Sequence, residues 1–346
     1  MKTKRKLIPL LPIVAATLLL AGLATTPGRA LAQVKPIELR YSSGAPPSGN
    51  PWVTQINRFA KDVEEESKGE IKVAPFLASQ LGSEQDTVQQ VARGRIDMGG
   101  YSSGAAALIV PEMALVVMPM YWKNSAELDC VLDNHLLKPM QDLFAKRGIF
   151  LMGWTEVGNI DLWGKKTYLS PKDLLGAKAA AYPNKTQQLF YASQGANANI
   201  LGLPEWIPAF QTGLAEVVLT TVTSALPMGL TKSATVATRG FYDSPGLTLM
   251  NKATFDKMAK PQQEALLRAS ARHPSAVYRT EVRGFENVLF GMHEKAGGQA
   301  VNLTPDQRAA WRKALEPVYP QIVKDVGGDA ERIFGVMEAG IKACAK

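Results

Sequence analysis

Short β-rich segments alternate with amphipathic helical patterns through the first third of this 346-residue chain. Residues 37–41 alternate apolar and polar side chains, which is typical of a strand. Apolar residues over 53–63 then recur at helical spacing. Residues 71–77 and 96–101 predict two more strands, with a helix over 84–95 between them. This β-α-β-α-β order predicts an α/β fold, in which helices cover a parallel sheet.

The same alternation returns in the second half of the chain. Strands are predicted at 150–154, 177–182 and 217–222, and helices at 186–193 and 207–212. A long amphipathic helix around 282–292 and a capping box at Thr304-Pro305-Asp306-Gln307 make the end of the chain helical. The sequence therefore predicts two α/β units followed by a helical tail. A cleft between two such units is a common place for a ligand.

The first residues have the three parts of a secretory signal peptide. A basic start over residues 2–6 precedes a charge-free apolar run over 7–24, and the small-residue site Ala30-Leu31-Ala32 follows. We predict that residues 1–32 are a signal peptide, cleaved before Gln33. An uncleaved membrane anchor is the alternative, which the cleavage-site pattern disfavours. No cysteine stands where a lipid would be attached, which argues against a lipoprotein.

Most of the positive charge of the chain belongs to this N-terminal segment. The whole chain has 39 Lys and Arg residues against 31 Asp and Glu residues, a formal charge of +8. Removal of residues 1–32 leaves 34 basic against 31 acidic residues, or +3. The near balance argues against a nucleic-acid partner, which requires a basic surface on the folded part. No later segment is long and apolar enough to span a membrane.

Sequence patterns of enzymes are weak in this chain. Residues 100–104 fit the G-x-S-x-G motif after a predicted strand, which makes Ser102 the candidate nucleophile of a secreted esterase. A triad also needs an acid and a histidine. The three histidines are His135, His273 and His293, and none stands in a pattern that indicates this role. We therefore expect that the protein is not an enzyme.

Phosphate and metal motifs are also lacking. Residues 158–165 resemble a phosphate loop, but the spacing of the glycines is too long and no Ser or Thr follows the lysine. The histidines are scattered, and Cys130 and Cys344 stand 214 positions apart. We therefore predict no metal and no cofactor. In an exported protein the two cysteines either form a disulfide or remain separate thiols, and the sequence leaves both possibilities open.

Four stretches of the chain resemble one family of receptors. They are FAKDVEEESKGEIKV at 59–73, QLGSEQDTVQQVARGRIDMGG at 80–100, PKDLLGAK at 171–178 and GANANILGLPEWIPAFQTG at 195–213. Each motif is short, but their order and spacing over about 150 residues are specific. In this arrangement the chain resembles the substrate-binding proteins of TRAP transporters, the DctP-type receptors.

The resemblance implies a two-lobed periplasmic binding protein fold, with hinge strands and long C-terminal helices. Lobe I would comprise residues 33–156 with about 246–283, lobe II would comprise 157–245, and residues 284–346 would pack across both lobes. Such proteins close on a small molecule by a hinge motion. The implied function is capture of a small organic molecule in the periplasm and its delivery to the small and large permease subunits in the membrane. A receptor that presents its ligand to a membrane sensor kinase is the alternative.

The arginines with which this family binds carboxylates are missing from the matching positions. A guanidinium binds a carboxylate at two points, and other cations replace it poorly. Ala180 stands where the family has an Arg in the strand after PKDLLGAK, and Asn159 (or Ile160) stands where a second Arg often lies. Glu216-Val217 replaces the Asp-Gly pair of a later motif.

Three interpretations of these missing arginines stay open. In the first, which we favour, the ligand is neutral, apolar or aromatic. In the second, another cation replaces the arginines, and Lys185 is the nearest candidate. In the third, the chain has left transport and acts with a sensor.

Most candidate ligand-binding residues lie at or near predicted strand ends, where ligands meet α/β sheets. Trp52 follows the first loop, Glu84 is near a helix start, where a capping role is the alternative, and Trp206 stands in the fourth matched stretch. Aromatic candidates suit a flat or apolar ligand, although aromatic residues also dominate protein cores. Polar candidates suit hydrogen bonds to a neutral ligand, although the same residue types cap helices. Ala180 is included as the position of a missing arginine. The full set is Ser43, Trp52, Glu84, Tyr101, Trp154, Asn159, Ala180, Tyr182, Trp206, Thr220 and Thr221.

Overall fold

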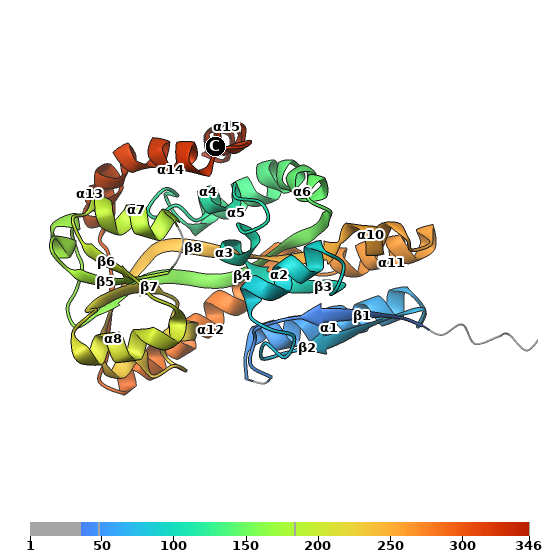
Figure 1. Ribbon diagram of the computed structural model, residues 1–346, viewed down its shortest axis with the longest axis horizontal. Coiled ribbons are helices and arrows are strands. Elements are labelled where there is room, and N and C mark those ends of the chain that lie inside the picture. Colours follow the sequence, from blue (N-terminus) through green and yellow to red (C-terminus); the bar gives the residue numbers. More distant parts are fainter. Residues whose placement is uncertain (1–35, 48, 183–184, 346) are drawn as a thin grey trace, which may run out of the picture. The chain divides into compact units, whose positions relative to one another are not determined.

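The computed structural model describes residues 36–47, 49–182 and 185–345 (Figure 1). The predicted signal peptide, residues 1–32, lies outside these residues. Within the described part of the chain, no helix combines the length and the apolar character that a membrane span needs.

The described residues form a mixed sheet of nine strands with the order β2-β1-β3-β8-β4-β7-β5-β6, and β9 (Gln299–Asn302) pairs with β8. On one side, β1 (Ile37–Ser42) pairs in parallel with β2 (Ile71–Phe76) and β3 (Met98–Ser102). On the other side, β5 (Lys178–Ala181) pairs in parallel with β6 (Asn197–Ile200) and β7 (Val217–Thr220). The first group confirms the predicted parallel strands. In the second group β5 and β7 were predicted, while β6 was not.

Two long antiparallel strands join these two halves of the sheet (Figure 1). β4 (Ile149–Gly164) and β8 (Val236–Asn251) pair from Ile149 opposite Asn251 to Gly164 opposite Val236. β3 pairs with the end of β8, and β7 pairs with the end of β4. Each long strand therefore belongs to both halves, as the hinge strands of a two-lobed fold do.

The sequence predicted only a short strand at 150–154 and no strand over β8. Most of β8 is buried on both faces, so its side chains lack the alternation of a half-exposed strand. Pro245 and Gly246 stand inside it, and both residue types usually indicate a turn. The segment that resembled a phosphate loop, residues 158–165, lies almost entirely within β4.

The helices begin where the sequence provides caps. Asn50 accepts a hydrogen bond from the backbone N–H of Val53 (3.1 Å) at the start of α1 (Pro51–Glu66). Thr304 and Gln307 form the predicted capping box of α13 (Pro305–Leu315). Other helices of the described part are α2 (Glu84–Ala92), α3 (Ser103–Ala106), α4 (Met113–Val116), α5 (Ser125–Val131), α6 (Leu137–Lys146), α7 (Lys185–Ser193), α8 (Trp206–Thr212), α9 (Val222–Ala225), α10 (Lys252–Asp256), α11 (Lys260–Ala271), α12 (Ser275–Lys295), α14 (Tyr319–Val326) and α15 (Ala330–Cys344).

Helix α12 contacts both halves of the sheet. It packs against β4, and it also contacts α1 next to β2 and α9 after β7. This arrangement agrees with the prediction of a long helix near the end of the chain. The exact lobe boundaries, at residues 156/157 and 245/246, stay a prediction.

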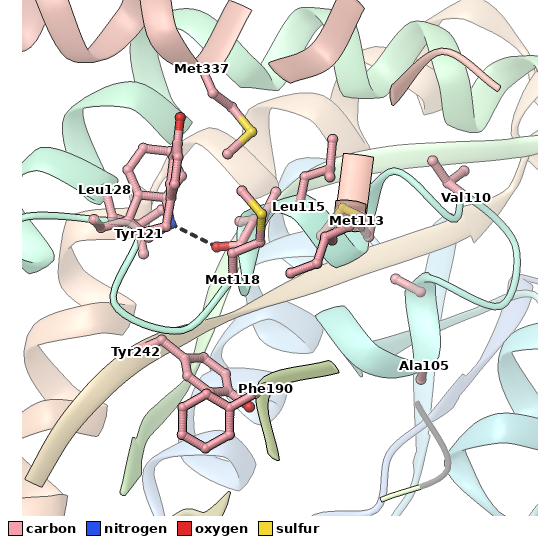
Figure 2. Close-up of a cluster of buried hydrophobic side chains, with 14 of the residues drawn as sticks. Ala105, Val110, Met113, Leu115, Met118, Tyr121, Leu128, Phe190, Tyr242 and Met337 are labelled. Atoms are coloured by element: carbon pink, nitrogen blue, oxygen red, sulfur yellow. Dashed lines mark hydrogen bonds between the residues drawn. The ribbon is translucent and has the colours of Figure 1, made fainter. Parts of the chain in front are cut away.

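The largest hydrophobic core extends from the middle of the chain to its last helix. Met113, Leu115 and Met118 are fully buried, and Met337 of α15 points toward Met118 (Figure 2). The C-terminal helix therefore contributes to the core, and its detachment would expose this methionine-rich cluster.

A disulfide fixes the same helix at its end. Cys130 of α5 is bonded to Cys344 of α15, and their Cα atoms are 6.1 Å apart. The sequence left this pairing open because nothing local brings positions 130 and 344 together. The packing of α15 against α5 brings them within bonding distance.

A hydrogen-bonded bulge bends β4 at its middle. The pairing register shifts between Glu156 and Gly158, where Gly158 has φ +126°. The side chain of Glu286, from α12, accepts hydrogen bonds from the backbone N–H of Asn159 (2.8 Å) and from its Nδ2 (3.1 Å). Burial raises the pKa of Glu286 to about 7. Helix α12 thus holds the hinge strand at the bulge, next to the predicted lobe boundary.

We expect Cys130→Ser/Cys344→Ser to lower the free energy of unfolding by about 3–5 kcal/mol, since the bond closes a very long loop in the unfolded chain. Urea unfolding of the mature protein measures this change. Reducing agent should lower the midpoint of the wild type toward that of the variant and leave the variant unchanged. Equal midpoints for oxidised wild type and variant would contradict the expectation.

We expect Gly158→Ala to destabilise the protein by about 2–4 kcal/mol, because a side chain is strained at this φ and overpacks the site. Its Cβ atom would lie 2.3 Å from Oε1 of Glu286. Gly153→Ala, in the same strand, is the matched control, since its Cβ atom would meet nothing within 4 Å. It should change the stability by less than about 1 kcal/mol. Similar losses in the two variants would reject the role of the bulge.

Candidate functional site

A cavity of about 620 Å³ lies where the two halves of the sheet meet. Its wall includes side chains from β1, β3 and β4 and from α1, together with the segment that joins α11 to α12. Leu203, Thr223, Ser224, Pro227 and Met228 close it from the other half. The cavity is therefore formed by segments far apart in the sequence.

Five of the predicted site residues line this cavity: Ser43, Trp52, Glu84, Tyr101 and Trp154. The two tryptophans are fixed by backbone acceptors. Nε1 of Trp52 donates to the carbonyl of Glu156 (2.8 Å), and Nε1 of Trp154 donates to the carbonyl of Leu132 (3.0 Å). Both rings are thus held in position by the protein itself. A rigid aromatic wall reduces the entropy that ligand binding costs.

Glu84 is a partly buried carboxylate on the wall of the cavity. Both the backbone N–H and the Oγ of Ser102 donate to it, the latter at 2.9 Å. Burial raises the pKa of Glu84. Ser102 also accepts a hydrogen bond from the N–H of Ala105 and caps α3. The G-x-S-x-G match therefore corresponds to a helix cap, and no histidine of the described chain bonds to Ser102.

The other six predicted residues do not line the cavity. Ala180 and Trp206 are fully buried in a core cluster that also contains Trp163. The ring of Tyr182 packs edge-on against Trp206, with centroids 5.2 Å apart. The carbonyl of Thr220 accepts from Nε1 of Trp163 (3.1 Å).

Asn159 and Thr221 are occupied by hydrogen bonds within the protein. Asn159 donates to Glu286 at the bulge, and Oγ1 of Thr221 accepts from the N–H of Ser224 (3.1 Å) and caps α9. Contact between these six residues and a ligand stays a prediction. Each of the six makes contacts within the protein that account for its place in the fold. Thr223 and Ser224, which follow Thr221, do reach the cavity.

The wall of the cavity contains no lysine or arginine among the described residues. Lys185, the candidate replacement cation, lies outside the wall, with Nζ 3.8 Å from Oδ2 of Asp325 and 64% of its side chain exposed. The ionisable acids and bases on the wall, apart from tyrosines, are Glu84, Glu156 and His273. The described residues include no group of three or more His, Cys, Asp or Glu side chains that could hold a metal.

Sequence reasoning missed several wall residues. Glu156 had a usable signal, because it follows Trp154 by two positions and so lies on the same face of the strand. His273 and Tyr278 had none, since their segment approaches the cavity only when α11 and α12 pack beside α1. Tyr41 and Phe59 had the spacing of core residues.

Comparison with known proteins identifies the family. Residues 42–325 match the model of the DctP family, bacterial extracellular solute-binding protein, family 7. A solute-binding protein of Verminephrobacter eiseniae is 30% identical over 277 residues, which cover 79% of this chain and 81% of the relative. The C4-dicarboxylate-binding periplasmic protein DctP of Rhodobacter capsulatus is 23% identical over 312 residues, or 89% of this chain and 92% of the relative.

Solved structures have the same fold. A TRAP periplasmic solute-binding protein of Roseobacter denitrificans with bound β-D-glucuronate superposes with a TM-score of 0.78 at 23% identity, over 87% of this chain and 99% of that one. The sugar acid binding protein DctPAm of Advenella mimigardefordensis, in complex with galactonate, gives 0.78 at 20% identity, over 90% and 99%. These similarities confirm the two-lobed α/β fold. The chain belongs to the DctP family of bacterial extracellular solute-binding proteins, whose members are substrate-binding receptors and not enzymes.

Proposed function

We propose that this protein is the periplasmic receptor of a TRAP-type transporter, and that it captures a small organic molecule without a carboxylate group. Membership of the DctP family supports the receptor role. The predicted signal peptide at residues 1–32 supports export to the periplasm. The cavity between the two halves of the sheet supports capture of a small molecule.

We infer the ligand specificity from the charge of the cavity wall. The described wall has two carboxylates, Glu84 and Glu156, and no lysine or arginine. A buried carboxylate ligand would find no lysine or arginine partner on the described wall, which is strongly unfavourable. The relatives above are named for dicarboxylates and sugar acids or hold glucuronate and galactonate. We therefore place this receptor outside that ligand class.

The position of the missing arginine supports the same conclusion. Ala180 has no exposed surface and belongs to the core cluster of Trp163 and Trp206. A longer side chain there would disrupt packed aromatic residues. The position of the missing arginine is thus a packed interior, and no lysine or arginine of the described residues lines the wall in its place.

The rest of the wall favours a ligand with an apolar face. Tyr41, Trp52, Phe59, Tyr101, Trp154 and Tyr278 contribute aromatic rings, and Met152 and Met228 contribute thioethers. Such walls bind flat or apolar groups, while a few polar atoms set the orientation. Delivery to small and large permease subunits completes the proposed cycle.

A thermal-shift panel on the mature protein tests this specificity. We expect compounds without a carboxylate to raise the melting temperature and glucuronate, galactonate and succinate to leave it unchanged. A ligand at a hundred times its Kd stabilises the folded state by about 2.7 kcal/mol.

Trp52→Ala should weaken the binding of each hit about tenfold or more through lost aromatic contact. Leu175→Ala, at a 75% exposed position outside the wall, should not. A shift with the carboxylates alone would reject the specificity.

Uptake measurements test the transport role. Cells that contain the matching small and large permease subunits should accumulate the hit compound only when this receptor is present. Uptake that is unchanged without the receptor would reject its role in transport and would leave ligand presentation to a sensor as the alternative.

A further inference from the structure

Glu156 has a buried carboxylate oxygen without a hydrogen-bond partner on the wall of the cavity. The residue is only 1% exposed. Its Oε2 accepts from Nη2 of Arg283 (3.1 Å), while its Oε1 has no hydrogen-bond partner among the described residues. Buried carboxylate oxygens nearly always have a partner in folded proteins. Glu156 is one of the residues that line the cavity, so a small rotation of its side chain would let a bound ligand supply this partner.

The charges behind Glu156 favour a positive ligand. Arg283 is shared, because it also forms two hydrogen bonds with Asp129, at 2.7 and 2.9 Å. Arg279 is likewise divided between Asp129 and Asp133. The acidic groups in this layer outnumber the arginines: Asp129, Asp133, Glu156, Asp243 and Glu286 face Arg279, Arg283 and the more distant Arg308. When Glu156 ionises, a cation in the cavity would offset the added negative charge.

The aromatic rings of the wall are compatible with the same charge. Trp52 adjoins Glu156 through its hydrogen bond to the Glu156 carbonyl, and Tyr101 and Trp154 line the same cavity. A cation near the face of such a ring is attracted by its quadrupole, and the attraction increases when water is excluded. Aromatic rings and a carboxylate together form a common site for an ammonium group.

Resting on the receptor function proposed above, we propose that the ligand is a small amine with an aromatic or apolar body. Its ammonium group donates a hydrogen bond to Oε1 of Glu156, and its body lies against Trp52, Tyr101 and Trp154. The cavity volume of about 620 Å³ is sufficient for a molecule of this size.

Proton release accompanies binding in this proposal. Burial raises the pKa of Glu156 to about 8; Asp243, Asp129 and Glu286 add to the increase and Arg283 opposes it. Glu156 of the empty receptor is therefore mostly protonated at neutral pH. A bound ammonium group stabilises the ionised form. Affinity for an amine should thus rise between pH 6 and pH 8, a range over which an alkyl ammonium stays charged.

Two matched sets of probes test the proposal by calorimetry on the mature protein. One set is tyramine, its alcohol tyrosol and its acid 4-hydroxyphenylacetate; the other is tryptamine, tryptophol and indole-3-acetate. We expect at least one amine to bind about tenfold or more tightly than its alcohol, and the acids not to bind. Titrations at pH 7 in two buffers of different ionisation enthalpy should show proton release with the amine only.

Glu156→Gln isolates the carboxylate with little change in shape. It should weaken amine binding about tenfold or more, abolish the proton release and leave the alcohol within about twofold of its wild-type affinity. Glu156→Asp keeps the charge and should retain the preference for the amine over the alcohol. Glu264→Gln, at an exposed carboxylate on α11 outside the wall, is the charge control and should change neither. Thermal melts verify that each variant is folded.

The outcomes separate this proposal from the receptor function. An alcohol that binds as tightly as its amine, an amine preference that persists in Glu156→Gln, or no binding of either amine at millimolar concentration would overturn the amine assignment. In each of these cases a hit in the wider thermal-shift panel would still support the receptor function. Tightest binding of the acids would reject both the amine assignment and the specificity against carboxylates.

Discussion

The antiparallel pairing of β4 with β8 is the constraint on which the rest of this structure depends. These two 16-residue strands are the part of the sheet that both halves share. A bulge after Glu156 bends β4 in the middle of this pairing, and Glu286 of α12 binds the backbone there. The same stretch of β4 places Trp154 and Glu156 on the wall of the cavity. Hinge and ligand site are therefore built from one strand, so closure and binding are physically coupled.

The chemistry of the cavity distinguishes this receptor from the relatives that bind acids. At the position where the resemblance implies an arginine, Ala180 is packed into an aromatic core, and the described wall has carboxylates and rings but no guanidinium. A two-lobed scaffold tolerates such a change because the pairing of β4 with β8 does not depend on the wall side chains. In the proposed specificity, the sheet determines the fold of this chain and a few wall residues determine its ligand.

The sequence predicted the elements near the wall better than the wall itself. Predicted strand ends contain Trp154 and Tyr101, and both residues line the cavity, while their contact with a ligand stays a prediction. Ala180 and Trp206 lie in a core cluster and not on the wall. Ala180 belongs to the mostly buried strand β5, whose two sides look alike in the sequence, and Trp206 begins helix α8. Tyr278 and His273 gave no local signal, since packing of α11 and α12 against α1 brings them to the cavity. The pairing of Cys130 with Cys344 likewise needed the contact of α15 with α5.

The sequence by itself determined the α/β class, the parallel strand groups at both ends of the sheet, the helix caps and the family. These properties depend on local periodicity, capping residues and short motifs, which can be read within a window of a few turns or strands. The tertiary structure alone decided the course of β8, the disulfide, and which aromatic and acidic side chains share the cavity. Those features depend on contacts between residues far apart in the chain, and the free energy of such contacts is not encoded in any single segment.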